Sequence, residues 1–166
     1  MKKLLVMVGT ALLLSACAST PDNDDMSMYM DPQTGGWNDS VNILELQPTA
    51  LTKAFQKTGN DVVYFTVNGY SLDAAAKADL AAQAEWLKQN PRALIVIEGR
   101  CDERGTREYN LALGDRRANA ARSYLTTLGV EPNRIRTISY GKDKPVVFGS
   151  DEEAWAKNRS ATTVAY

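Results

Sequence analysis

One short apolar run, Leu94-Ile95-Val96-Ile97, constrains the fold more than any other feature of the sequence. An uninterrupted run of this kind, rich in β-branched residues, is typical of a strand that is covered on both faces. Helical patterns flank it, because apolar residues recur at helical spacing over 73–89 and again over 106–128. The sequence therefore predicts a sheet on which helices pack.

Further strands and a short helix complete the predicted order. Residues 61–67 and 135–140 are rich in β-branched and aromatic side chains, and residues 161–166 form a weaker strand. Residues 151–157 begin with acidic side chains, which the dipole of a helix favours at that end. The predicted order is β-α-β-α-β-α-β, an α/β fold (an α+β sandwich) with helices packed on a four-stranded mixed sheet.

The chain contains no histidine. This excludes Ser-His and Cys-His nucleophiles, a histidine general base, and most zinc and copper sites. Two cysteines cannot form a disulfide framework or a four-thiolate metal site, and a net charge of −1 provides no cationic field for nucleic acid. Composition favours a binding or structural module over an enzyme, and we expect no cofactor, no metal and no nucleic-acid partner.

The N-terminus has the pattern of an export signal. A basic start precedes an apolar run over 4–14, which is too short for a membrane-spanning helix of about 20 residues. Leu14-Ser15-Ala16-Cys17 resembles the bacterial lipobox, which implies cleavage after residues 1–16 and acylation of Cys17. Ala18 in place of an aspartate implies sorting to the outer membrane. The alternative is an ordinary signal peptide followed by a coincidental cysteine.

A stretch of one charge sign follows the predicted lipid anchor. Residues 18–45 contain six acidic residues and no basic residue, and prolines and glycines interrupt any periodicity. Such a segment buries too little apolar surface to order itself, and like charges extend it. We predict a disordered acidic tether over 17–45, with docking of its methionines and Trp37 on the domain as the alternative. Residues 46–166 are predicted to form the folded domain.

Charges of both signs gather after the apolar strand. Between Glu98 and Arg122 lie six basic and five acidic residues, mixed along the chain. A uniform basic patch would suit a phosphate backbone. Mixed signs suit a zwitterion instead, because one side chain can meet an ammonium and another a carboxylate. A loop between a strand and a helix is a common position for such functional groups.

The residues of this segment resemble the OmpA-like peptidoglycan-binding domain family. The match is dense in Asp102-Glu103-Arg104-Gly105-Thr106, in 109–114 and in 116–119, and it continues in 139–142, 144–145 and 157–159. The resemblance covers residues 61–166. It implies a non-enzymatic domain that binds the cell wall.

The resemblance also implies which side chains bind the ligand. In the family, an aspartate and an arginine hold the meso-diaminopimelate of the wall's stem peptide, and the matching residues are Asp102 and Arg117. A carboxylate accepts hydrogen bonds from an ammonium, and a guanidinium grips a carboxylate in a fork. Asn110 is a further candidate, and the turn at Phe65 and Thr66 could offer backbone groups. The alternative is that Asp102 and Arg117 only pair with each other, or cap the second helix, and stabilise the fold.

The order of lipobox, tether and domain is similar to that of lipoproteins of the Tol envelope system. This implies an outer-membrane anchor on the periplasmic side, peptidoglycan as a ligand, a periplasmic β-propeller protein as a partner, and a role in cell division. Thr66, Asn68 and Arg100 depart from the family's usual residues near the expected pocket. Thr66 and Arg100 motivate the alternative of a diverged lipoprotein that acts as a protein scaffold with weak or no wall binding. A wall-cleaving enzyme using Asp102 and Glu103 is the third hypothesis, although adjacent carboxylates suit a two-acid mechanism poorly.

Overall fold

The structure is a computed structural model that describes residues 30–31 and 33–166, with the side chain of Glu45 left out. The predicted signal peptide over 1–16, the predicted lipidation site Cys17, and residues 18–29 and 32 of the predicted tether lie outside the described residues. Within the described part of the chain, no helix is both long and apolar enough to cross a membrane.

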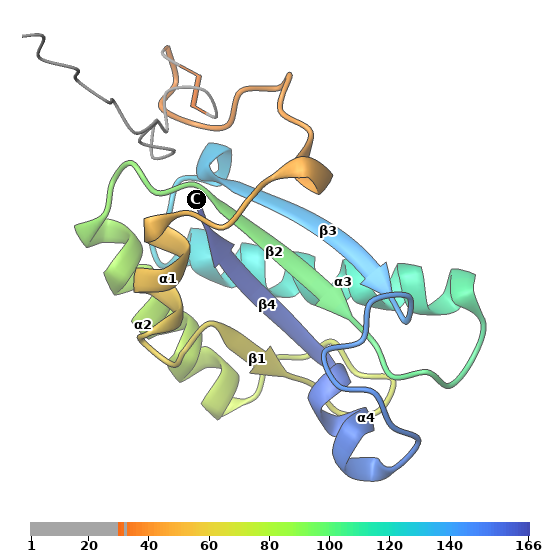
Figure 1. The fold of residues 1–166 in the computed structure, drawn as a ribbon. Coiled ribbons are helices and arrows are strands. Elements are labelled where there is room, and N and C mark those ends of the chain that lie inside the picture. The colour runs from red at the N-terminus through yellow and green to blue at the C-terminus, as the bar shows by residue number, and fades with distance from the viewer. Residues whose placement is uncertain (1–29, 32) are drawn as a thin grey trace, which may run out of the picture.

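Four strands and four α-helices form the domain (Figure 1). Their bounds are β1 Val62–Tyr64, β2 Ile95–Arg100, β3 Ile135–Gly141 and β4 Ser160–Ala165, with α1 Ala50–Gln56, α2 Ala74–Gln89, α3 Arg107–Thr127 and α4 Glu152–Asn158. Side chains cap the helices where the sequence placed their starts: Asp73 for α2, Thr106 for α3 and Asp151 for α4 each accept a hydrogen bond from a backbone N–H of the first turn.

The sheet has the order β1-β4-β2-β3. β2 pairs with β3 in parallel, and β4 lies between β1 and β2, antiparallel to both. The predicted α/β class with a four-stranded mixed sheet is therefore confirmed. The sequence did not reveal that the weakest strand occupies an interior position, where hydrogen-bonded neighbours on both sides compensate for its modest propensity.

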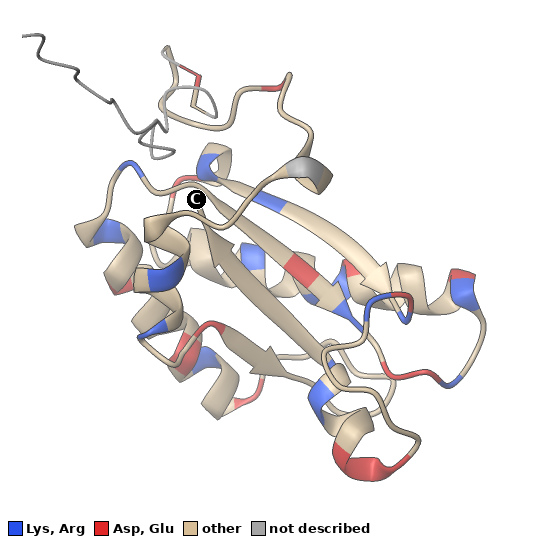
Figure 2. Cartoon of the chain, in the orientation of Figure 1, with Lys and Arg blue, Asp and Glu red and all other residues tan. Residues whose placement is uncertain are grey.

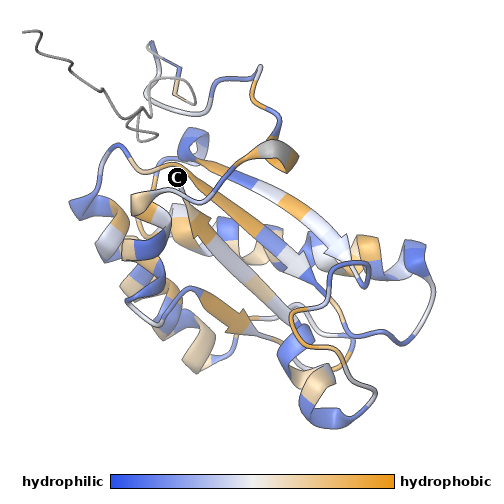
Figure 3. Cartoon of the chain, viewed as in Figure 1, coloured by the Kyte–Doolittle hydropathy of each residue, from blue (hydrophilic) through white to orange (hydrophobic). Residues whose placement is uncertain are grey.

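Alternate residues of β2 belong to two different hydrophobic layers. Ile95 and Ile97 pack with α2 and α3, whereas Leu94 and Val96 face the other side of the sheet. This follows from the alternation of side chains along a strand and explains the continuous apolar run. Hydrophobic residues colour β1 and the first half of β2 in Figure 3, and α3 crosses behind the sheet in Figure 1.

The second hydrophobic layer includes part of the segment that was predicted to be a disordered tether, so that prediction is wrong for this part. Residues 33–45, expected to be disordered, contain the short helix Ile43–Glu45, and Trp37 is buried between the segment and the sheet. The indole N–H of Trp37 donates to the carbonyls of Ile95 (3.2 Å) and Arg134 (3.1 Å), and its ring meets Tyr166 edge-on with 6.0 Å between centroids. The burial of one large aromatic side chain and the hydrogen bonds of its N–H thus order a segment whose acidic composition predicts disorder. Docking of Trp37, the alternative to the tether, is what the structure shows.

Helix α1 was also absent from the predicted order. It begins in a capping box in which Thr49 and Thr52 bond each other's backbone N–H groups. Phe55 buries its ring against Trp86, with 4.9 Å between the ring centroids. The helix is short, so its apolar periodicity is too brief to stand out in the sequence.

Candidate functional site

The candidate site lies where β2 leads into α3. Two glycines bring these elements together: a Cβ on Gly99 would lie 1.9 Å from the carbonyl oxygen of Gly114. The backbones therefore touch, and the loop 101–106 that joins the elements closes a cavity against the segment after β1. Acidic and basic residues are interspersed at this end of the sheet and do not form a patch of one sign (Figure 2).

A cavity of about 330 Å³ opens at this loop. It brings together three of the five predicted ligand-binding residues, Asp102, Asn110 and Arg117, from the loop and from two turns of α3. Its lining consists of Val67, Asn68, Cys101, Asp102, Arg104, Gly105, Tyr109, Asn110, Leu113 and Arg117.

Arg117 forms the floor of the cavity and is 0% exposed to solvent. Its guanidinium donates to the carbonyls of Gly69 (2.8 Å), Arg100 (2.8 Å) and Thr66 (3.1 Å). Its charge lies 5.2 Å from the ring centroid of Phe65. Burial lowers the pKa of Arg117 from its ordinary value, but a guanidinium stays protonated in proteins. These hydrogen bonds use three of the five N–H groups of the guanidinium, which also lies beside the thiol of Cys101.

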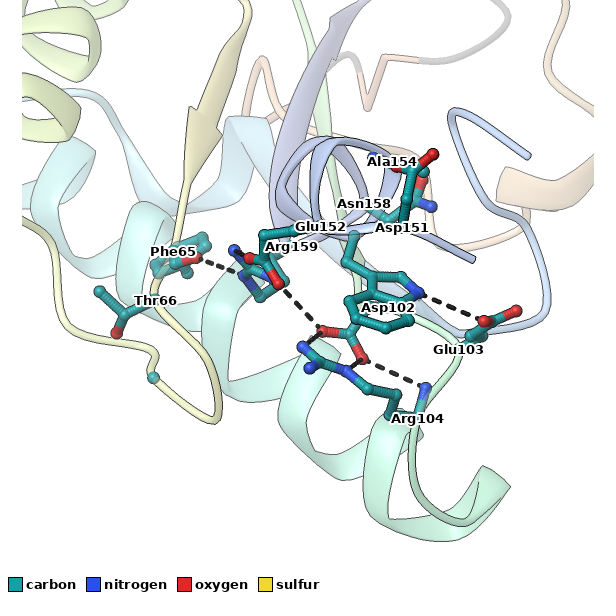
Figure 4. A network of polar contacts seen from close by, with 12 residues as sticks. Phe65, Thr66, Asp102, Glu103, Arg104, Asp151, Glu152, Ala154, Asn158 and Arg159 are labelled. Carbon is teal, nitrogen blue, oxygen red and sulfur yellow. Dashed lines mark hydrogen bonds and ion pairs between the residues drawn. The ribbon is translucent and has the colours of Figure 1, made fainter. Parts of the chain in front are cut away.

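Asp102 lies at the edge of the same cavity, and its ion pairs go to other arginines. Its Oδ1 accepts from Arg104 backbone N–H (3.2 Å) and Nε (3.1 Å), and its Oδ2 accepts from Arg104 Nη2 (2.6 Å). Arg159 Nη1 lies 3.5 Å from Oδ2 (Figure 4). Burial would raise the pKa of the Asp102 carboxyl, but the hydrogen bonds from Arg104 outweigh it and hold the pKa below 3.8, its ordinary value. The carboxyl is therefore ionised at neutral pH.

This arrangement differs from the alternative in which Asp102 and Arg117 pair only with each other. In the described part of the chain, the ion pairs of Asp102 are those with Arg104 and Arg159. A negative carboxylate and a buried guanidinium thus line one cavity without a direct pair between them. The geometry suits a ligand that carries charges of both signs.

Asn110 has a partly structural task. Its amide nitrogen donates to the carbonyls of Arg104 (2.8 Å) and Thr106 (3.0 Å), which fixes the loop to the first turns of α3. Among the described residues, no group donates to its Oδ1. This oxygen remains available as an acceptor beside the cavity.

Phe65 and Thr66 play a different part from the one predicted. The carbonyl of Phe65 accepts from Arg159 Nε (3.2 Å), and that of Thr66 accepts from Arg117 Nη2 (3.1 Å). These carbonyls therefore position the arginines and are not directed to a ligand. Neither residue lines the cavity of about 330 Å³.

Arg100, suspected of altering the pocket, does not line it either. Its side chain pairs with Glu98 and donates to Thr162 Oγ1 (3.1 Å), so only its backbone carbonyl contributes, by holding Arg117. The side chain at this position is therefore not part of the cavity lining. Asn68 does line the cavity, in a left-handed conformation with φ of 55°.

Sequence reasoning missed the two arginines that surround Asp102. Arg104 forms an ion pair with Asp102 within the loop, and it also lines the cavity and lies over the ring of Trp155 at 4.2 Å from its centroid. Arg159 is buried and pairs with Glu152 Oε1 at 2.7 Å. The spacing of 57 residues between Asp102 and Arg159 gives no local signal for their contact.

The thiol of Cys101 lines the cavity but is not activated. Burial raises its pKa, so it stays protonated at neutral pH, and its Sγ lies 3.4 Å from the carbonyl oxygen of Asn110. Among the described residues, no group of histidine, cysteine or acidic side chains is arranged to hold a metal ion.

Comparison with known proteins gives a consistent result. The OmpA family profile matches residues 64–159. A protein of Pasteurella multocida named peptidoglycan-associated lipoprotein is 36% identical over 96% of this chain and 94% of its own length. One of the same name from Rhizobium meliloti is 55% identical over 63% of this chain, and the match spans only 59% of that relative.

Solved structures resemble the domain as well. The crystal structure of the peptidoglycan-associated lipoprotein from Burkholderia pseudomallei shares 46% identity with a TM-score of 0.62, over 64% of this chain and 90% of that one. The C-terminal domain of Helicobacter pylori MotB has a TM-score of 0.60 at 20% identity, over 64% of this chain and 84% of that one, which shows a shared fold.

Proposed function

The chain belongs to the OmpA family, and we propose from this premise that it binds peptidoglycan non-covalently at the cavity between Asp102 and Arg117. One observation carries the proposal: two side chains of opposite charge line one cavity, and neither neutralises the other directly. Proteins 36% and 46% identical to this chain are named peptidoglycan-associated lipoproteins, which supports the same ligand.

The proposed contact is with the zwitterionic end of meso-diaminopimelate in the stem peptide. There, an ammonium and a carboxylate share one carbon atom, so both charges enter the cavity together. Asp102 would accept hydrogen bonds from the ammonium, and the remaining N–H groups of Arg117 would donate to the carboxylate. The unoccupied Oδ1 of Asn110 would accept a further one. Each charge-assisted hydrogen bond contributes about 1.5–3 kcal/mol.

We also propose that this binding links two layers of the cell envelope. The lipobox resemblance supports a lipid on Cys17 in the outer membrane, so the domain would hold that membrane to the wall. A weak single site suffices, because many copies tethered beside a polymer gain a high effective concentration. The resemblance to Tol-system lipoproteins supports a periplasmic β-propeller partner and a role in cell division.

The geometry supports binding better than catalysis. Hydrolysis of a glycosidic bond needs a protonated carboxylic acid as general acid. Asp102 is ionised, since its pKa is lowered, and Glu103 Oε1 accepts a hydrogen bond from Trp155 Nε1 at 3.2 Å. Asp102 is therefore not prepared to donate a proton to a substrate.

The test compares two variants that remove the same charge. Full-length chain in detergent is incubated with isolated sacculi, and a diaminopimelate-containing stem peptide is titrated by calorimetry. Asp102→Asn should weaken peptide binding about 10- to 100-fold, through loss of the ammonium's partner. Asp143→Asn is the control, because Asp143 pairs with Arg107 and does not line the cavity.

Two results would count against the proposal. Equal binding of the peptide by Asp102→Asn and wild type would rule out the proposed binding site. Absence of binding by folded wild-type protein to both sacculi and peptide would remove the function and favour the protein-scaffold alternative.

A further inference from the structure

The carboxylate proposed to receive the ligand's ammonium already has a partner. Arg104 donates three hydrogen bonds to Asp102, one from its backbone and two from its guanidinium, at 2.6–3.2 Å. Arg159 Nη1 lies 3.5 Å from Oδ2. A carboxylate offers about four lone-pair sites, of which Arg104 occupies three, while Arg159 Nη1 lies beside the carboxylate without forming a hydrogen bond. An incoming ammonium can therefore form more than one hydrogen bond to Asp102 only if one of these groups moves away.

The donors differ in how readily they can move. The Arg104 backbone N–H is fixed by the loop. Arg159 is 7% exposed and is held by the carbonyl of Phe65 and by Glu152. The Arg104 side chain is 40% exposed, and apart from Asp102 its guanidinium contacts the face of Trp155. The Arg104 side chain is therefore the one that a ligand can displace at the lowest cost.

Charge balance indicates which ligands can displace it. Arg104 and Arg117 line the cavity against the single lining carboxylate of Asp102, whereas the charge of Arg159 is also paired with Glu152. A bare amine adds a third positive charge to the cavity and takes from Arg104 the carboxylate with which it pairs. A zwitterion adds no net charge, and its carboxylate offers the released guanidinium a new partner.

We infer that Arg104 is a displaceable counter-ion of Asp102 that moves to the ligand's carboxylate on binding and thereby selects zwitterions over simple amines. This inference rests on the proposed function and adds a specificity-determining residue to the proposed site. Arg117 at the floor and Arg104 at the edge then share the ligand's carboxylate. Trp155 supports the guanidinium of Arg104 in the unbound state.

Two stem peptides that differ at one residue test the inference. One carries meso-diaminopimelate, and the other carries lysine, which has the same amine without the adjacent carboxylate. Their dissociation constants are measured by calorimetry for the full-length wild type, Arg104→Gln and Arg107→Gln. The last variant is the control, because Arg107 is an exposed arginine that pairs with Asp143 and does not line the cavity.

The selectivity is the dissociation constant of the lysine peptide divided by that of the diaminopimelate peptide. We expect Arg104→Gln to lower this ratio at least fivefold, chiefly through tighter binding of the lysine peptide. Arg107→Gln should leave the wild-type ratio unchanged. Arg117 is present in every variant, so its preference for a carboxylate cancels when the ratios are compared. An unchanged ratio in Arg104→Gln would overturn the displacement and leave the proposed function standing, provided that wild type binds the diaminopimelate peptide.

Fluorescence gives a second readout that a purely structural role would not change. Removal of the guanidinium from the ring of Trp155 should change its emission when the diaminopimelate peptide binds to wild type. The change should vanish in Trp155→Phe, which lacks the reporter, and in Arg104→Gln, which lacks the moving group. A peptide-induced change of wild-type size in Arg104→Gln would contradict the inference. Wild-type protein that binds neither peptide would instead contradict the proposed function.

Discussion

At the scale of single residues, Arg117 combines a proposed role in binding with a role in stability. Its three hydrogen bonds reach the segment after β1 and the end of β2, so the cation that faces the cavity also holds the cavity's walls together. A guanidinium suits this task because its donors have a fixed planar geometry that an ammonium lacks. Loss of ligand binding in an Arg117 variant is therefore not evidence of ligand contact unless folding is measured as well.

We predict that Arg117→Ala lowers the free energy of unfolding by about 3–5 kcal/mol. The substitution leaves the carbonyls of Thr66, Gly69 and Arg100 without these donors and opens a void beside Phe65. Urea unfolding followed by circular dichroism measures the loss. Arg116→Ala, at the exposed neighbouring position, should cost less than about 1 kcal/mol. A loss below about 1 kcal/mol for Arg117→Ala would contradict the structural role.

The lowered pKa of Asp102 predicts a dependence of stability on pH. A carboxyl whose pKa is lower in the folded state than in the unfolded state stabilises the fold above the unfolded value. This contribution is lost as the pH falls from 3.8 through the lower folded-state pKa. Unfolding free energies measured between about pH 5 and pH 2 should thus fall less steeply for Asp102→Asn than for wild type. Identical slopes for the two proteins would contradict the shifted pKa.

At the scale of the elements, the contact of α3 with β2 determines where the cavity residues lie. Gly99 and Gly114 let the two backbones meet, and a Cβ on Gly114 would also lie 2.4 Å from Ser139 Oγ. That hydroxyl donates to the carbonyl of Leu111 at 2.7 Å, which connects β3 to the same helix. Asn110 and Arg117 therefore depend on this contact for their positions relative to Asp102.

Gly99→Ala should displace α3 from the sheet. The added methyl group would meet the backbone of Gly114, which cannot rotate away, so we expect a loss of about 3 kcal/mol in unfolding free energy and weaker binding of the stem peptide. Thermal unfolding and calorimetry measure the two effects. Ala112→Ser, at an exposed position of α3, is the control and should change stability by no more than about 0.5 kcal/mol. Wild-type stability of Gly99→Ala would contradict the close approach.

The elements could be predicted from sequence to the extent that local patterns determine them. The starts of α2, α3 and α4 follow from capping residues and the burial of β2 from its apolar run, because both effects act between neighbouring residues. The interior position of β4 and the contact of Arg159 with Asp102 depend on pairings far apart in the chain. Resemblance indicated Asp102 and Arg117, but nothing in the sequence showed that Arg104 occupies the carboxylate.

At the scale of the whole molecule, the segment before α1 completes the second hydrophobic layer. Trp37, Leu94, Val96 and Tyr166 form this layer, and Asp39 pairs with Arg136 at 3.1 Å at its edge. Residues 46–166 have more basic than acidic residues, so the acidic segment lies against a domain of opposite net charge. Without this segment, the apolar side chains of β2 on that face would be open to solvent.

Trp37→Ala should release the segment while the rest of the domain stays folded. The substitution removes a ring that is 6% exposed together with its two hydrogen bonds, and truncation of a buried tryptophan costs about 3–5 kcal/mol. Cleavage beside Asp39 by a protease specific for aspartate should become at least tenfold faster. Leu44→Ala, at a side chain 63% exposed, should leave the rate unchanged. Equal cleavage of Trp37→Ala and wild type would contradict the docking.

The docked tryptophan sets a limit on distance across the envelope. Met30 pairs with the docked Trp37 in an isolated β-bridge, and it lies thirteen residue steps after Cys17. Even a fully extended chain of that length reaches only about 45 Å. A linker that extended from Cys17 to residue 46 would reach about twice as far. If the acyl chains lie in the membrane and the cavity binds the wall, the docking of Trp37 shortens the linker between them. The distance between membrane and wall then cannot exceed the extended length of the linker plus the width of the domain.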